Sequence, residues 1–169
     1  QPRKDYKKRA RLLNGSVSSM GSKSIKEQVA ELMKSSLKSG DKASLGFARN
    51  LHSAIRKMEI DTRTDLQDAD VIKIVFNSVK QRQDSVDQFR KGGRDDLVAQ
   101  EEAEVRFLQQ FLPAQMTEAE LRTLVQEVIA EVQATSAKDL GKVMKLLLPK
   151  TQGKADGKLV NEVVRTFLK

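Results

Sequence analysis

The sequence predicts an all-α protein, built as an N-terminal four-helix bundle followed by a small C-terminal three-helix domain. Leu, Lys, Glu, Gln and Ala, which favour helices, are frequent, while the 169 residues include three prolines and 4% aromatic residues. Apolar side chains recur at helical spacing in seven successive stretches. Pro113, followed by a capping-box sequence that starts at Thr117, separates the first four stretches from the last three.

A basic leader over residues 1–21 is expected to lie outside these domains. Residues 1 to 19 hold six basic side chains against one acidic side chain, so they supply five of the eight net positive charges. The favoured interpretation is a tag or another non-native extension, encoded by a vector or translated from upstream sequence. A nucleic-acid-binding arm and a transit-like peptide are the alternatives.

The bundle, over residues 22–113, is expected to open with two helices joined by a short turn at Ser39 to Asp41. Ser24 and Glu27 form a capping box for the first helix, and the second stops near residues 61 to 64. Both helices carry an apolar stripe at helical spacing. The stripes are Ile25, Val29, Leu32, Met33 and Leu37 on the first helix, and Leu45, Ala48, Leu51, Ile55 and Met58 on the second.

The third and fourth helices are predicted to form a hairpin. Asp68 or Asp70 caps the third helix, and Gly92 and Gly93 free the backbone for a left-handed helix end. The fourth helix runs from residue 95 to residue 112. Their inward residues are Val71, Ile72, Val75, Phe76, Val79, Val86 and Phe89 on the third helix, and Leu97, Val105, Leu108, Phe111 and Leu112 on the fourth.

The polar face of this hairpin carries more charge of both signs than solubility requires. It holds Lys80, Arg82, Arg90 and Arg94 among Asp84, Asp87, Asp95, Asp96, Glu101 and Glu104. The favoured interpretation is a solvated face with exposed ion pairs worth about 0 to 1 kcal/mol each, and a binding surface comes second. Glu101 and Glu104 have the spacing of an acid and base pair, but salt bridges to Lys80 or Arg82 across the hairpin are the stronger expectation.

The C-terminal domain, over residues 114–169, is predicted to hold three helices. Thr117 and Glu120 form a capping box for the first, and Ser136 caps the second, which ends at Pro149. Their apolar residues are Leu121, Leu124, Val125, Val128, Ile129 and Val132, then Leu140, Val143, Met144, Leu147 and Leu148, then Leu159, Val160, Val163, Val164, Phe167 and Leu168. Because its core is small, this domain is expected either to pack against the neighbouring domain or to move relative to it.

The sequence predicts no catalytic residue, no metal site and no cofactor. It has no cysteine and one histidine, His52, which is interpreted as structural. The stretch from Gly153 to Lys158 has one residue too few for a phosphate-binding loop and lacks the Ser or Thr that should follow, so an ordinary flexible turn is expected. No apolar run approaches the roughly 20 residues of a membrane span, and the absence of cysteine suits a reducing compartment.

One local feature points to an anionic partner. Between residues 138 and 158, six lysines stand against Asp139 and Asp156. They are Lys138, Lys142, Lys145, Lys150, Lys154 and Lys158. Glycines beside them let the backbone approach a phosphate, and the lack of aromatic residues indicates phosphate contact rather than base stacking. A solvated lysine face on a small domain is an equally weighted alternative.

Two segments carry a resemblance to a known family. The stretch KQRQDSVDQFRKGGRDDLVAQEEAEVRFLQQFLPAQMTEAEL, followed by KDLGKVMKLLLPKTQGKADGKLV, resembles the YqeY family, small bacterial proteins with a GatB/YqeY domain. The match covers residues 25 to 169. The residues that carry the resemblance are Lys80, Gln81, Arg82, Ser85, Gly93, Arg94, Leu97, Glu101, Glu104, Leu112, Pro113, Gly141, Lys142, Val143, Met144, Gly153, Ala155, Asp156 and Gly157.

The resemblance implies the same helical bundle plus three-helix domain, and it relates the latter to the tail of GatB. GatB is a subunit of the amidotransferase that converts misacylated Glu-tRNA or Asp-tRNA to its amide, and its tail contacts tRNA. The domain that activates the carboxylate with ATP and the amidase subunit have no counterpart here. An amidotransferase label would therefore follow from the domain name alone.

Three hypotheses of function follow. The first is a noncatalytic protein that binds tRNA or structured RNA through its lysine-rich C-terminal domain. The second is an amidotransferase-related accessory, by association with carbon-nitrogen ligase activity that uses glutamine as amido-N-donor. The third is a protein adaptor that uses the motif surface of Lys80, Arg82, Ser85, Arg94, Glu101 and Glu104. The lack of a nucleophile, a metal set or a nucleotide loop favours the first and third. A bacterial, cytoplasmic protein without a membrane partner is expected.

Overall fold

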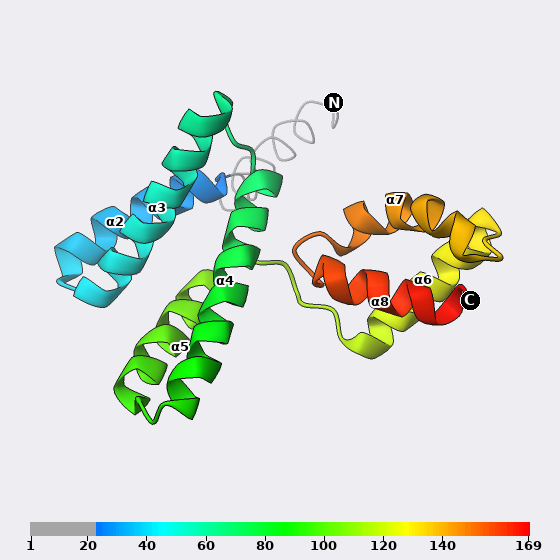
Figure 1. Cartoon of the computed structure of the whole chain (residues 1–169). Coiled ribbons are helices and arrows are strands. Elements are labelled where there is room, and N and C mark those ends of the chain that lie inside the picture. Colours follow the sequence, from blue (N-terminus) through cyan, green and yellow to red (C-terminus); the bar gives the residue numbers. More distant parts are fainter. Residues whose placement is uncertain (1–22) are drawn as a thin grey trace, which may run out of the picture. The chain divides into compact units, whose positions relative to one another are not determined.

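The computed structural model describes residues 23–169, and over this range it is helical without any strand (Figure 1). The predicted all-α class is confirmed. The elements are α2 (Ile25–Ser39), α3 (Lys42–Thr62), α4 (Asp68–Lys91), α5 (Asp95–Gln109), α6 (Glu118–Val132), the short 3-10 turn η1 (Ala137–Asp139), α7 (Leu140–Thr151) and α8 (Gly157–Phe167). The predicted leader lies outside the described residues.

The chain forms two compact units, one that extends to Val71 and one that extends from Ile72 to Lys169. The break in helical structure predicted around Pro113 is confirmed, because α5 ends at Gln109 and α6 begins at Glu118. The grouping of the helices into four and three stays a prediction.

In the first unit, α2 and α3 pack side by side as a hairpin. The Ser24 hydroxyl accepts the N–H of Glu27, as predicted, and Gly40 ends α2 with a φ of 75°. The Asp41 carboxylate accepts the N–H of Ser44 at 3.0 Å and so caps α3. The buried apolar residues of this unit are Ile25, Val29, Ala48, Leu51, Ile55, Leu66 and Val71.

Two residues of the predicted stripes are exposed instead of buried. Leu37 is 64% exposed and Met58 is 43% exposed. The inward face continues through Ser36, which is buried, and through Glu59, whose side chain is 10% exposed. Ser36 lies seven residues, close to two full turns, beyond the buried Val29 and so stays on the inward face, whereas Leu37 lies about 100° further round the helix. Met58 lies seven residues after the buried Leu51, so helical spacing alone does not account for its exposure.

In the second unit, α4 and α5 form the predicted hairpin. Gly93 takes the left-handed conformation with a φ of 69°, and the N–H of Arg94 bonds the carbonyl of Phe89 at 2.9 Å. Val98, rather than the predicted Leu97, is the buried residue in the first turn of α5. The other buried apolar residues are Val75, Val79 and Val86 of α4, Val105 and Leu108 of α5, and Phe111 after it.

The helices α6, α7 and α8 enclose one apolar core. The capping box at Thr117 is confirmed, because its hydroxyl accepts the N–H of Glu120 and the Glu120 carboxylate accepts the N–H of Thr117. The core residues are Leu121, Val125, Val128, Val143, Leu147, Val160, Val163, Val164 and Leu168.

Three details of this domain differ from the prediction. Pro149 does not end α7, which continues to Thr151. Pro149 has no backbone N–H, so it cannot bond the carbonyl of Lys145, four residues earlier in α7. Ser136 caps the turn η1 rather than α7 itself. Leu148 and Leu159, predicted to face inward, are exposed.

Candidate nucleic-acid interface and charged hairpin

The six lysines predicted to contact RNA are all exposed and are carried by three consecutive segments. Lys138 lies in η1, Lys142, Lys145 and Lys150 lie on α7, and Lys154 and Lys158 lie in the loop after it and at the start of α8. Within the described residues, only Lys142 and Lys150 of these six have a carboxylate at ion-pair distance, Asp139 and Glu131, each at 3.9 Å. The ammonium groups therefore remain largely unneutralised.

The loop from residue 152 to residue 156 is held in place on several sides. The side-chain amide of Gln115 donates to the carbonyl of Gly153 at 2.7 Å, and the N–H of Met116 donates to the carbonyl of Lys154 at 2.9 Å. Gly153 has a φ of 73°, and a Cβ there would collide with Cγ2 of Ile72. The sequence predicted an ordinary flexible turn here, whereas the loop is tied to the segment before α6 and packs closely on Ile72.

Lys80 anchors the same loop from α4. Its ammonium group bonds the Asp156 carboxylate at 2.7 Å. The hydrogen bond from Lys80 lowers the pKa of Asp156, and the hydrogen bond to Asp156 raises the pKa of Lys80. Asp156 also caps α8 by accepting the N–H of Lys158 at 3.1 Å. Lys80 and Arg82 were the two cations expected to bridge to Glu101 or Glu104, and Lys80 is not the one that does so, because it bonds Asp156.

Arg82 makes the predicted bridge across the hairpin to both glutamates. Its guanidinium lies 3.3 Å from Oε2 of Glu101 and 3.3 Å from Oε2 of Glu104. The Glu104 side chain is 10% exposed and the Arg82 side chain 37% exposed. Because the carboxylates of Glu101 and Glu104 are mostly removed from water, this cluster joins the two helices and is more than a solvated face.

The remaining residues of the motif surface bond locally. The Ser85 hydroxyl donates to the Gln81 carbonyl one turn earlier, at 3.1 Å. Arg94 binds the Asp96 carboxylate with two hydrogen bonds of 3.2 and 3.1 Å, and these raise the pKa of Arg94 and lower that of Asp96. The Ser85 bond lies within α4, and the Arg94 bonds lie at the start of α5. Within the motif surface, Lys80 therefore binds the loop, and the other residues make bonds within or between α4 and α5.

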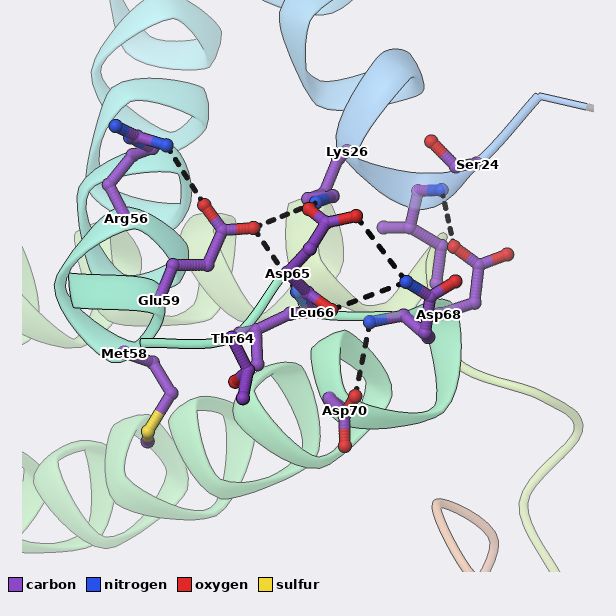
Figure 2. A network of polar contacts seen from close by, with 12 residues as sticks. Ser24, Lys26, Arg56, Met58, Glu59, Thr64, Asp65, Leu66, Asp68 and Asp70 are labelled. Carbon is purple, nitrogen blue, oxygen red and sulfur yellow. Dashed lines mark hydrogen bonds and ion pairs between the residues drawn. The ribbon is translucent and has the colours of Figure 1, made fainter. Parts of the chain in front are cut away.

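A polar network in the first unit was missed by the sequence analysis (Figure 2). Glu59 accepts from Lys26 at 2.7 Å, from Arg56 at 3.0 Å and from the N–H of Leu66 at 3.3 Å. Lys26 also bonds Asp65. The bonds to Asp65 and then to Glu59 raise the pKa of Lys26, and the bond from Lys26 lowers the pKa of Glu59.

This network lies where α2 begins and α3 ends, and it joins the two helices there. Asp68 contributes by accepting the N–H of Ile25, the first residue of α2, at 2.9 Å. The expected capping role of Asp70 is confirmed in part, since its carboxylate accepts the N–H of Gln67 just before α4. The signal in the sequence was Glu59 itself, an acidic residue one helical repeat after the buried Ile55.

His52 is exposed on α3. Among residues 23–169, no group of three or more His, Cys, Asp or Glu side chains is placed to hold a metal ion. The helices of this range include none long and apolar enough to cross a membrane.

Comparisons with known proteins identify several similar proteins and one matching family model. A protein of Eremothecium gossypii named altered inheritance of mitochondria protein 41, mitochondrial, is 37% identical over 67 residues, which is 39% of this chain and 37% of the relative. The protein of the same name from Lachancea thermotolerans is 32% identical over 92 residues, 52% of this chain and 49% of the relative. The chain thus spans less than half the length of these relatives.

An uncharacterised protein of Schizosaccharomyces pombe is 41% identical over 46 residues, which cover 27% of this chain and 37% of the relative. These fungal relatives do not support the expectation of a bacterial origin, and the mitochondrial names do not fit a cytoplasmic location. The family model described as Yqey-like protein matches residues 26–168, nearly all of the described chain. The chain belongs to the YqeY-like family.

Proposed function

We propose that this protein is a noncatalytic module that binds tRNA or another structured RNA through the lysines of its C-terminal domain. The observation that supports this most is the set of six exposed lysines on η1, α7 and the following loop, which nearby carboxylates barely neutralise. The loop that carries Lys154 is held by Gln115, Met116 and the Lys80–Asp156 pair. A loop whose backbone is already held in place loses less entropy when it binds a phosphate backbone.

The test is tRNA binding by the full chain across a series of salt concentrations. Each phosphate contact contributes about 0.7 to 0.9 to the slope of log affinity against log salt. The substitutions Lys145→Ala and Lys154→Ala, made together, should therefore lower the slope by nearly two. Lys34→Ala with Lys38→Ala, which removes the same charge from exposed positions of α2, is the matched control. Equal effects of the two pairs would refute a site in the C-terminal domain.

The alternatives from the sequence predict other partners. An accessory of glutamine-dependent amidotransfer would copurify with an amidotransferase subunit, and an adaptor would copurify with another protein. Untagged protein, isolated from cells of its source, should instead bring tRNA with it. Recovery of a stoichiometric protein without RNA would favour the adaptor.

We also propose that the protein works in mitochondria. The names of two relatives support this, together with the basic composition of residues 1 to 19. A fluorescent fusion of the full chain should enter mitochondria, and a fusion that lacks residues 1–19 should not. Diffuse cytosolic fluorescence of the full-length fusion would count against the proposal.

A further inference from the structure

The outer face of α3 carries a line of basic side chains at intervals of seven residues. The line consists of Lys42, Arg49 and Arg56, with Arg63 directly after the helix, and all four are exposed. Seven residues advance roughly 10.5 Å along a helix and fall about 20° short of two full turns. The four side chains therefore follow one face over about 30 Å. We call this line the α3 basic face.

The α3 basic face lies away from the side of α3 that packs on α2. The buried residues of α3 are Ala48, Leu51 and Ile55, which occupy a different part of the helix circumference. Ser53, four residues after Arg49 and three before Arg56, is exposed on the same side of the helix. The face thus combines regularly spaced positive charge with a small polar side chain.

Most of this charge is unneutralised. Within residues 23–169, Lys42, Arg49 and Arg63 have no carboxylate at ion-pair distance. Arg56 lies 3.0 Å from Glu59, but Glu59 is shared with Lys26, at 2.7 Å. A surface that only needed solubility would gain from interspersed carboxylates, as are found on α5.

The chemistry of the face selects one class of partner. A partner helix would require an apolar seam between the charges, and a membrane surface would require a broad apolar face. The face offers one large exposed apolar residue, Ile60, among polar neighbours. Arginine binds phosphate with two parallel hydrogen bonds, and a Ser side chain also donates to phosphate oxygens.

We propose that the α3 basic face binds the phosphate backbone of a nucleic acid, as a second site in the first compact unit. It does not depend on the lysines of the C-terminal domain, because it belongs to other elements and its own residues supply the charge. Spacing of charge over about 30 Å suits an extended backbone better than a small anion, which one or two of these residues would satisfy.

The test uses the full chain and an RNA duplex of two helical turns, with affinity measured across a salt series. Lys42→Gln with Arg49→Gln removes two charges of the face and leaves the Arg56–Glu59 bond intact. The expected result is a salt slope lower by about 1.4 to 1.8, at 0.7 to 0.9 per lost contact, and an unchanged thermal midpoint. The control, Lys34→Gln with Lys38→Gln on α2, removes the same charge and should leave the slope near that of the wild type.

Two outcomes would overturn the proposal. One is an equal fall in the control variant, which would show that net charge alone governs binding. The other is displacement of the RNA by polyglutamate or by phosphatidylglycerol vesicles as effectively as by unlabelled RNA, which would show a general anion surface. A further variant, Arg49→Lys, keeps the charge but loses the paired hydrogen bonds, so it should weaken binding at an unchanged slope.

The same assay separates this proposal from the function proposed above. A decrease in the salt slope that is seen only in the Lys42/Arg49 variant supports the α3 basic face and refutes the lysine site. A loss that is confined to the Lys145/Lys154 variant does the reverse. Losses in both variants but not in the α2 control support two sites.

Discussion

The stability of the α4–α5 hairpin should depend strongly on the side chain of Arg82. Arg82→Ala would leave Glu101 and Glu104 without their cation, and Glu104 is mostly buried. The loss of a hydrogen bond between charged groups, with a carboxylate left behind, costs about 1.5 to 3 kcal/mol. We expect a decrease of that size in the free energy of unfolding, measured by urea denaturation.

Arg90 provides the control on the same helix. Its side chain is 60% exposed and bonds Glu102 at 2.9 Å, so Arg90→Ala should cost about 0 to 1 kcal/mol. Equal losses for the two variants would show that the Arg82 cluster is as solvated as an ordinary surface pair.

Gly153 is a second residue whose replacement should destabilise the protein. Gly153→Ala would force a side chain into a backbone with φ at 73° and into contact with Ile72. We expect a loss of about 1 to 3 kcal/mol. Gly141→Ala is the matched control, since nothing lies within 4 Å of a Cβ there and α7 contains the residue. That substitution should stabilise the protein by about 0.5 to 1 kcal/mol, and a loss at Gly141 as large as at Gly153 would contradict the steric argument.

At the scale of elements, the attachment of the α7–α8 loop to α4 should depend on pH. The pKa of Asp156 is lowered in the folded state, so its contribution to stability is present above its ordinary pKa of 3.8 and is lost as pH falls below that value. The pKa of Lys80 is raised, so its contribution is present below the ordinary value of 10.5 and is lost as pH rises through the higher value of the folded state.

The variant that tests this is Asp156→Asn, because asparagine still caps α8 but cannot pair with an ammonium group. The difference in urea midpoint between wild type and variant should be positive at pH 7 and should shrink toward pH 3. A difference that persists unchanged at pH 3 would show that Asp156 acts through something other than its charge.

The helices themselves were predictable from the sequence, and their long-range partners were not. Caps at Ser24 and Thr117 and the reversal at Gly93 depend on residues within one or two turns, so local chemistry specifies them. The sequence left Lys80 and Arg82 as alternative partners of the two glutamates, and the bond from Lys80 to Asp156 was not foreseen because Asp156 lies far away in the sequence. Glu59 was overlooked because its partners Lys26 and Leu66 meet it only through the fold.

At the scale of the whole molecule, positive charge is distributed over the leader and both compact units. Removal of residues 1–19 takes away five of the eight net charges and should lower the salt slope of tRNA binding by itself. The further decrease caused by Lys145→Ala with Lys154→Ala should be nearly the same with and without the leader, since independent sites contribute additively. If that decrease appears only in the presence of the leader, the lysines supply general charge and no separate site.

The close contact between Gly153 and Ile72 also bears on the order in which the chain folds during synthesis. The Arg82 cluster joins residues 19 apart in the sequence, so the α4–α5 hairpin can form soon after both helices leave the ribosome. Ile72 has to wait for Gly153, which is made 81 residues later. Until then, the side of α4 that receives the loop is uncovered, and a nascent chain stalled before residue 153 should be recognised by chaperones that a chain released after it would escape.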